Sequence, residues 1–240
     1  MDVEARERFF NARQGWSFRQ RLKALDSYGL LLALIVLSLI ASSFSPSDLH
    51  AYMPAVRAAI LGGTLAFALH TSGAKRSTYV VCGALILIAV LSTFVVDAGT
   101  KQGKIVDAVA GMLLVGAMLV VILRRFLAHP VITGQSVLAA ICVYVLFGLG
   151  YAAIYGLIGA IDPTALFANG IGEGTNVERI YYSFITLCTV GYGDFVPYGN
   201  VTRMVAVTEA LVGQVYLVTI VALLVSHVGS QRPRAGSDTG

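Results

Sequence analysis

Six apolar stretches set the fold of this 240-residue chain. Each is long enough, at about 17 residues or more, for an α-helix to cross a bilayer. A backbone inside a membrane must satisfy its own hydrogen bonds, so each stretch is predicted to be helical. We therefore expect an all-α membrane protein with six transmembrane helices. The stretches cover residues 28–44, 51–70, 78–96, 105–127, 136–161 and 201–228.

The composition agrees with this interpretation. Hydrophobic residues make up 57% of the chain and charged residues only 12%, whereas a soluble protein carries about 25% charged residues. Three cysteines, Cys82, Cys142 and Cys188, lie in apolar sequence or next to it. An odd number without a pairing pattern predicts free, buried thiols. The polar, basic start of the chain predicts a signal anchor rather than a cleaved leader.

The basic residues predict the orientation, because cytoplasmic loops are rich in Lys and Arg. Twelve lie at the ends and in alternate connections, against five in the other connections. We expect a multi-pass protein of the plasma or inner membrane with both termini in the cytoplasm. The twelve are Arg6, Arg8, Arg13, Arg19, Arg21, Lys23, Lys75, Arg76, Arg124, Arg125, Arg232 and Arg234; the five are Arg57, Lys101, Lys104, Arg179 and Arg203.

Residues 1–27 form a basic N-terminal segment, and residues 3–26 have an amphipathic helical pattern. Phe18, Leu22 and Leu25 fall on one face, and Trp16 is suited to the membrane interface. Such a helix can lie on an anionic lipid surface. An equally good interpretation packs it against the cytoplasmic side of the bundle. Residues 230–240 are expected to be a short cytoplasmic tail.

Between the last two stretches runs Thr189-Val190-Gly191-Tyr192-Gly193-Asp194. Residues 178–188, which precede it, are predicted to form a re-entrant helix too short to span a membrane. Gly191 and Gly193 can adopt positive φ, so that successive carbonyl groups can face one axis. The Thr189 hydroxyl adds a further oxygen. Stacked oxygens of this kind can replace the water shell of a cation, provided that several chains meet around the axis.

This hexapeptide, placed between two spanning helices, resembles the selectivity filter of tetrameric potassium channels. Residues 133–229 are similar to small prokaryotic two-helix pores, with four extra helices in front. The resemblance implies a four-helix bundle over residues 28–127 and a pore domain over 128–229, with three further identical subunits as partners. It implies K⁺ binding at Thr189, Val190, Gly191, Tyr192 and Gly193.

The resemblance also implies how the filter is supported. Tyr181 and Tyr182 match the paired aromatic residues around family filters, and Tyr182 is expected to hydrogen-bond Asp194. Simple aromatic packing is the alternative for Tyr182. Ile185 occupies a position where some relatives carry a buried Glu, so we do not expect the inactivation that depends on that acid.

In the last stretch Gly213 matches the hinge glycine of the family's inner helix, although close helix packing explains a glycine equally well. Leu217, Val221 and Val225 would face the axis and close it as a hydrophobic constriction. Glu209 lies inside the stretch, where an acid must face protein or water. A structural role for Glu209 is favoured over one in gating or pH response.

The first four helices lack the charges of a voltage sensor, which needs about 3–4 positive charges per subunit within the membrane field. Residues 105–123 contain no Lys or Arg, and Arg124 and Arg125 are adjacent at the predicted cytoplasmic end. Arg57 is an isolated charge near the predicted outer end of the second apolar stretch. It is expected to snorkel or to pair with Asp48. We therefore predict a channel that is not strongly voltage-gated.

Acids in the loop that bears the filter would concentrate cations at its mouth. For two of them, Asp162 and Glu173, the role of an ordinary solvated loop acid is preferred. The four are Asp162, Glu173, Glu178 and Asp194.

Taken together, these patterns predict a homotetrameric channel that conducts K⁺ passively. The four histidines are scattered without metal-ligand spacing, and no Gly-rich phosphate loop is present, so no enzyme, cofactor or nucleic-acid partner is expected beyond the permeant ion. Two alternatives remain: a subunit of a K⁺ transporter, although single-chain proteins of that kind carry four such loops, and a membrane sensor with a non-conducting pore.

Overall fold

The computed structural model describes residues 18–43, 53–72, 76–95, 100–168 without 128–133, and 172–229. Within these ranges the chain is all-helical, as predicted, with seven α-helices, one 3₁₀ turn and no β-strand. The elements are α2 (Phe18–Ser43), α3 (Met53–Ser72), α4 (Arg76–Val95), α5 (Lys101–Leu127), α6 (Gly134–Ile161), η2 (Pro163–Ala165), α7 (Asn176–Leu187) and α8 (Asn200–Gly229).

The described part of each predicted apolar stretch lies in one long helix. Three of them, α5, α6 and α8, are long and apolar enough to cross a membrane, while the apolar sections described for α2, α3 and α4 are shorter. The described part of the predicted amphipathic helix is continuous with the first spanning helix, because α2 runs from Phe18 to Ser43. Good helix formers fill residues 19–25 and no Gly or Pro occurs between 18 and 27, so nothing interrupts the helix there. Trp16 and residues 230–240 lie outside the described residues.

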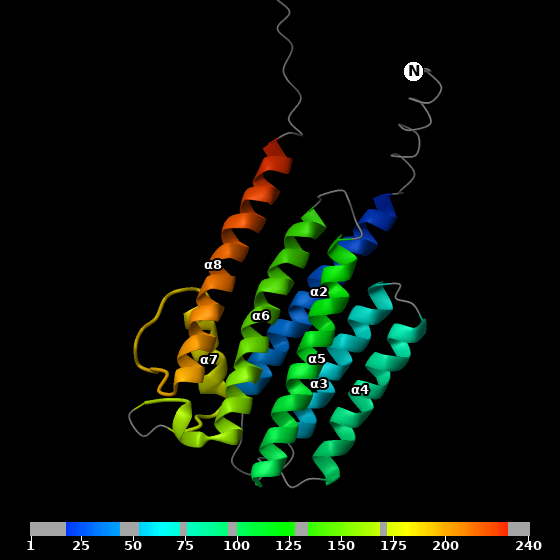
Figure 1. Ribbon diagram of the computed structural model, residues 1–240. Helices are drawn as coiled ribbons and strands as arrows, with labels where there is room; N and C mark the ends of the chain where they lie inside the picture. Colours follow the sequence, from blue (N-terminus) through cyan, green and yellow to red (C-terminus); the bar gives the residue numbers. More distant parts are fainter. Residues whose placement is uncertain are drawn as a thin grey trace, which may run out of the picture.

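Helices α2 to α6 lie side by side, and α7 and α8 stand on the far side of α6 (Figure 1). Helix α6 packs most extensively against α5 and also contacts α2, α7 and α8. The short helix α7 contacts both α6 and α8. The first residues of α2 and the last residues of α8 lie at the same end of the molecule (Figure 1). The front helices of the chain thus pack against its own α6.

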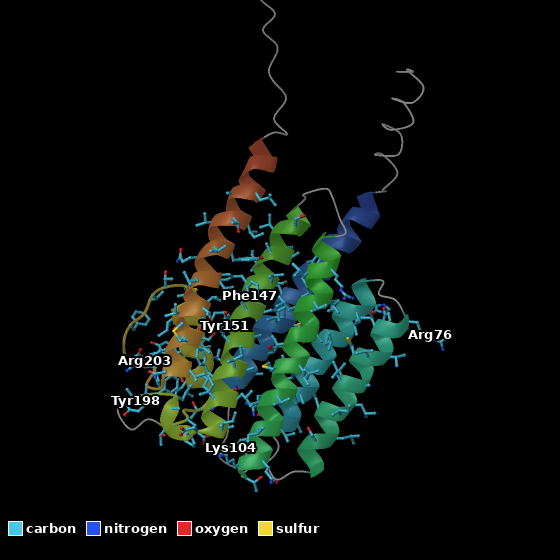
Figure 2. The ribbon with its side chains drawn as sticks, viewed as in Figure 1. Arg76, Lys104, Phe147, Tyr151, Tyr198 and Arg203 are labelled. Atoms are coloured by element: carbon cyan, nitrogen blue, oxygen red, sulfur yellow. The ribbon has the colours of Figure 1, made fainter. Side chains whose placement is uncertain are left out.

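Two clusters of buried side chains hold these helices together, and α6 contributes to both. The larger cluster includes Leu31, Leu65, Met118 and Leu146, and its members come from all five helices α2, α3, α4, α5 and α6. The smaller one joins α6 to α7 and the loop between them: Tyr155, Leu166, Phe167, Tyr182 and Ile185. On the side towards α8, Phe147 of α6 packs edge-on against Tyr216 at a centroid distance of 5.4 Å (Figure 2). A helix that is apolar on all sides suits this central position.

The described structure contains three free cysteines, as expected. Cys82 and Cys142 are buried, which agrees with the prediction, but Cys188 is exposed. The prediction of burial is wrong for Cys188 because α7 ends at Leu187, so the thiol lies on the segment that leaves the packed helix.

The loop from α6 to α7 is held by specific contacts of its acids. The Asp162 carboxylate accepts hydrogen bonds from the Thr164 hydroxyl at 2.7 Å and the Thr164 amide at 3.0 Å. These two bonds lower the pKa of Asp162. Glu173 forms an ion pair with Lys104 of α5. Both acids therefore have structural partners and are not simply solvated.

Helix α8 approaches the end of α7 most closely at Gly213. A Cβ atom built at Gly213 would overlap the Leu187 carbonyl oxygen and would lie 3.0 Å from its Cδ1. Since the backbone oxygen cannot swing away as a side-chain atom can, only glycine allows this contact. The geometry accounts for Gly213 by close packing, and a hinge is not needed to explain it.

We predict that Gly213→Ala lowers the thermal stability of the protein. Overpacking a close contact costs about 1–3 kcal/mol, more than the gain of up to about 1 kcal/mol that alanine gives in a helix. Gly116→Ala in α5 is the matched control, because no atom lies within 4 Å of its Cβ position. Thermal unfolding in detergent should give a lower midpoint for Gly213→Ala only; equal midpoints for both variants would contradict the packing role.

Candidate functional site

The candidate site begins with α7, whose start is fixed by a capping box. The Thr175 hydroxyl accepts from the Glu178 amide at 3.2 Å, and the Thr175 amide donates to the Glu178 carboxylate at 2.6 Å. This cap starts the helix at Asn176, two residues before the predicted start. The 12 residues of α7 extend about 18 Å, too short to cross a membrane.

The backbone of the loop after α7 alternates in handedness. Thr189, Gly191 and Gly193 have φ values of 56°, 54° and 81°, and the intervening Val190 and Tyr192 do not have positive φ. Both glycines behave as the sequence predicted. Thr189 is the one non-glycine residue with positive φ in the described part of the chain. Unfavourable backbone of this kind is concentrated at functional sites.

The amide groups of this loop bond back to the end of α7. Val190 and Gly191 both donate to the Ile185 carbonyl, at 2.8 and 3.2 Å, and Thr189 donates to the Thr186 carbonyl at 2.9 Å. Because α7 takes up these N–H groups, the carbonyl oxygens are the backbone groups left to meet an ion. Ile185 thus positions the loop through its backbone, a role that its side chain could not reveal.

Tyr181 supports the loop from the side. Its hydroxyl donates to the Asp194 carboxylate at 2.8 Å, and its ring stacks on Tyr192 with a centroid distance of 6.5 Å. Tyr182 is buried instead, packed edge-on against Tyr155 and Phe167 at 5.0 and 5.1 Å. The predicted Tyr182–Asp194 bond is therefore wrong. Neighbouring residues on a helix point in different directions, so only one of the two tyrosines can face the loop.

Two contacts under the loop were missed by sequence reasoning. The Gln214 amide donates to the Thr189 hydroxyl at 2.9 Å, and the Tyr144 hydroxyl donates to the Leu187 carbonyl at 3.2 Å. Gln214 follows Gly213 in an apolar helix, and a polar side chain in such a place is itself a sign of a specific partner.

Glu209 is completely buried where α6, α7 and α8 meet. Its carboxyl group accepts from the Tyr155 hydroxyl at 2.6 Å and also bonds to the Ser183 hydroxyl. The Ser183 oxygen lies 2.7 Å from the Gly148 carbonyl. A serine hydroxyl has one proton and cannot donate to both acceptors. All three bonds form at once when Glu209 carries a proton and donates to Ser183, so the geometry favours a structural role.

The remaining predicted residues are placed as follows. Leu217 is exposed on α8, and the side chains of Val221 and Val225 lie outside the described residues. Arg57 pairs with Asp107 of α5 at 2.8 Å. Asp48, the predicted partner, lies outside the described residues. Asp107 was overlooked because the partners are fifty positions apart in sequence.

Comparison with known proteins agrees with this geometry. Residues 139–229 match a family model described as "Ion channel". The chain is 35% identical over 77 residues to "Two pore potassium channel a" of Oryza sativa subsp. japonica, covering 31% of this chain and 21% of the relative. It is 38% identical over 66 residues to "Two-pore potassium channel 4" of Arabidopsis thaliana, covering 27% and 23%. "Protein LctB" of Bacillus caldotenax is 36% identical over 84 residues, covering 32% and 61%.

The matched part of the chain runs from within α6 to the end of α8 and is similar to ion-channel domains, and the three long apolar helices fit a membrane protein. Two of these relatives are named as potassium channels. The chain spans about a fifth to three fifths of the length of these relatives. An ion channel is not a class of enzyme.

We predict that Tyr181→Phe weakens the discrimination of K⁺ from Na⁺. The variant keeps the stacked ring and loses the Asp194 hydrogen bond, worth about 0.5–1.5 kcal/mol, so the selectivity ratio should fall about two- to tenfold. Tyr182→Phe is the control, because its ring stays packed away from the loop. Ion flux into liposomes measures both variants. A larger effect of Tyr182→Phe than of Tyr181→Phe would support the sequence-based prediction that Tyr182 bonds to Asp194.

Glu209→Gln should leave folding and ion flux close to wild type. A glutamine can donate to Ser183 and accept from Tyr155, as a protonated Glu209 does. Glu209→Leu cannot: the Tyr155 hydroxyl loses its acceptor, at about 1–3 kcal/mol, and Ser183 keeps only its bond to the Gly148 carbonyl. Thermal unfolding compares the stability of both variants with that of the wild type. The pH dependence of ion flux is compared between the wild type and Glu209→Gln. A pH response that disappears in Glu209→Gln would show that the acid acts in gating.

Proposed function

We propose that four copies of this chain form a channel that conducts K⁺ passively and selectively. The observation that carries the proposal is the alternating backbone of Thr189–Gly193, with the amides of its first three residues bonded to α7. One chain supplies one such loop, and a dehydrated potassium ion is coordinated by carbonyls from four loops. The axis of the tetramer therefore runs past this loop, with K⁺ at Thr189, Val190, Gly191, Tyr192 and Gly193.

The exposed surface of the single chain supports the assembly. Val190 is 50% and Tyr192 71% exposed. An apolar row on α8 is also uncovered, and neighbouring subunits would cover part of it. The row comprises Val201, Met204, Val207, Leu211, Val215 and Val218.

Helix α7 contributes to ion binding through its direction. Its C-terminal end meets the loop, and a helix C-terminus carries partial negative charge. This charge stabilises a cation on the inner side of the filter. Below that point Leu217, Val221 and Val225 form the constriction that closes the pore.

The protein crosses the plasma or inner membrane six times, with both termini in the cytoplasm. The common position of the start of α2 and the end of α8 supports an even number of crossings (Figure 1). Helices α3 and α4 have 20 residues each, about 30 Å and enough for a bilayer core. With no Lys or Arg between residues 105 and 123, the channel is not strongly voltage-gated.

Purified protein in liposomes that hold a potassium gradient tests the proposal. We expect K⁺ flux that barium blocks, little Na⁺ flux, and a tetramer by native mass spectrometry. Tyr192→Ala should remove the selectivity or the flux. Tyr198→Ala is the matched control, since Tyr198 is also exposed but lies outside the filter. Absence of flux in the wild type, or flux in Tyr192→Ala equal to that in wild type, would sink the channel proposal and favour a non-conducting sensor.

A further inference from the structure

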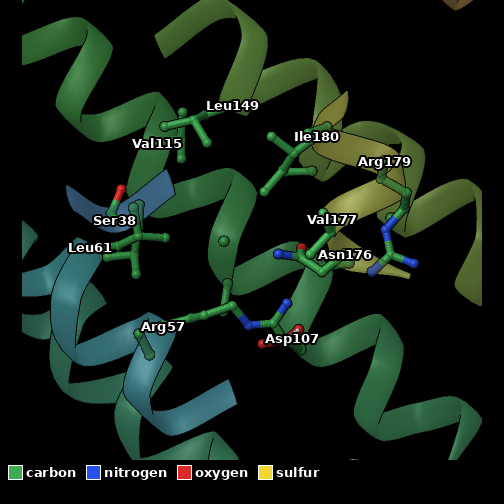
Figure 3. Close-up of a pocket in the computed structure, with 18 of the residues that line it drawn as sticks. Ser38, Arg57, Leu61, Asp107, Val115, Leu149, Asn176, Val177, Arg179 and Ile180 are labelled. Carbon is green, nitrogen blue, oxygen red and sulfur yellow. Dashed lines mark hydrogen bonds and ion pairs between the residues drawn. The ribbon is translucent and has the colours of Figure 1, made fainter. Parts of the chain in front are cut away.

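A cavity of about 590 Å³ lies between the front helices and the start of α7. Its walls come from α2, α3, α5 and α6 on one side and from residues 173–180 on the other (Figure 3). The volume falls in the range of about 300–1,000 Å³ that is usual for small-molecule sites. The cavity is separate from the filter, although Val177 and Ile180 of α7 belong to its lining.

One part of the cavity is strongly polar and carries an excess of positive charge. Three of the side chains that line it are basic and two are acidic. Asp107 forms an ion pair with one guanidinium nitrogen of Arg57, and Glu173 forms an ion pair with Lys104. The third basic group, Arg179, donates only to the carbonyls of Glu173 and Gly174 among the described residues, at 3.2 and 2.8 Å. Among the described residues no carboxylate forms an ion pair with Arg179, and Glu173, Asp107 and Glu178 act on it only through space.

Arg57 adds an unsatisfied donor to this part. Its Nε atom is buried and has no hydrogen-bond partner among the described residues. A buried donor without an acceptor costs about 1–3 kcal/mol, more for a charged group. Burial, and then the nearby charge of Arg57, lower the pKa of Arg179, so the two guanidinium groups act on each other. An anion between them would relieve both effects.

The rest of the lining is apolar. In Figure 3 the Arg57 side chain extends from α3 towards Asp107, while Val115 and Leu149 lie on the other side of the cavity. Leu61 and Ile180 continue the apolar lining. A ligand that fills the space must therefore present an anionic group at one end and a hydrocarbon chain at the other.

We infer that this cavity binds a single-chain anionic amphiphile, with its carboxylate or phosphate on Arg57 and its alkyl chain among Leu61, Val115 and Leu149. Two sources share this chemistry: a free fatty acid, and one acyl chain with the headgroup of an anionic phospholipid.

Binding of labelled dodecanoate to the full chain in phosphatidylcholine nanodiscs tests the inference, with dodecanol as the uncharged probe of equal length. This measurement needs no ion conduction, so it is independent of the proposed function. We expect saturable binding of dodecanoate, and binding of dodecanol about tenfold to a hundredfold weaker, the worth of a hydrogen bond to a charged group. Equal binding of acid and alcohol, or no binding of either, would overturn the inference.

Two charge variants separate recognition from folding. Arg57→Gln should weaken dodecanoate binding, whereas Asp107→Asn should strengthen it, because it frees the Arg57 guanidinium for the ligand. A purely structural role for the ion pair predicts loss of binding in both variants. That outcome would contradict the site.

Two glycine variants test the cavity itself. A Cβ atom at Gly111, which lines the cavity, meets no atom within 4 Å, so Gly111→Leu can fill the space without a backbone clash. Gly116→Leu on the same helix is the matched control, since Gly116 is equally open and lies outside the lining. Dodecanoate binding should be lost in Gly111→Leu and kept in Gly116→Leu. The same affinity in both would place the ligand elsewhere.

Nanodiscs that contain phosphatidylglycerol distinguish the two sources. Weaker apparent binding of dodecanoate there than in phosphatidylcholine supports the cavity and identifies an anionic phospholipid as the competitor. Equal binding in both membranes supports the cavity and identifies the free fatty acid as its ligand.

Discussion

The position of the filter loop depends on how one short helix is anchored. Helix α7 cannot span a membrane, so side chains must hold it at its start, middle and end. The capping box of Thr175 and Glu178 fixes the start. Glu209 bonds to Ser183 in the middle, and Gly213 admits the Leu187 carbonyl at the end. The first anchor is local to α7 and the other two come from α8, and together they set where residues 189–194 begin.

Helix α6 connects this anchored pore segment to the front of the molecule. It contributes to the large core with α2–α5 and to the small core with α7. A change in the packing of the front helices therefore reaches α7 directly, through atoms in contact. The cavity beside Arg57 lies at this junction, between the front helices and the start of α7.

The similarity to known proteins also separates the pore segment from the front helices. The family model covers residues 139–229, and the front helices lie before the matched range. Their charges argue against a voltage sensor, because α5 carries no Lys or Arg between residues 105 and 123. The distinctive polar feature of this part is instead the half-buried Arg57–Asp107 pair at the cavity. The front helices are thus better suited to ligand binding than to sensing voltage.

The sequence by itself determined the helical class, the long apolar helices and the glycine conformations of the filter, because these follow from local composition and from φ preferences. Only the tertiary structure decided which residues support the filter loop and which residue pairs with Arg57. Tyr181 and Tyr182 are adjacent and chemically identical, so only the rotation of α7 selects the one that meets Asp194. Gly213 suits a hinge or a close contact equally well until Leu187 is placed against it. Arg57 pairs with Asp107, which is fifty positions away in the sequence. The packing of α3 against α5 brings the two residues together, and the sequence alone gives no sign of this pair.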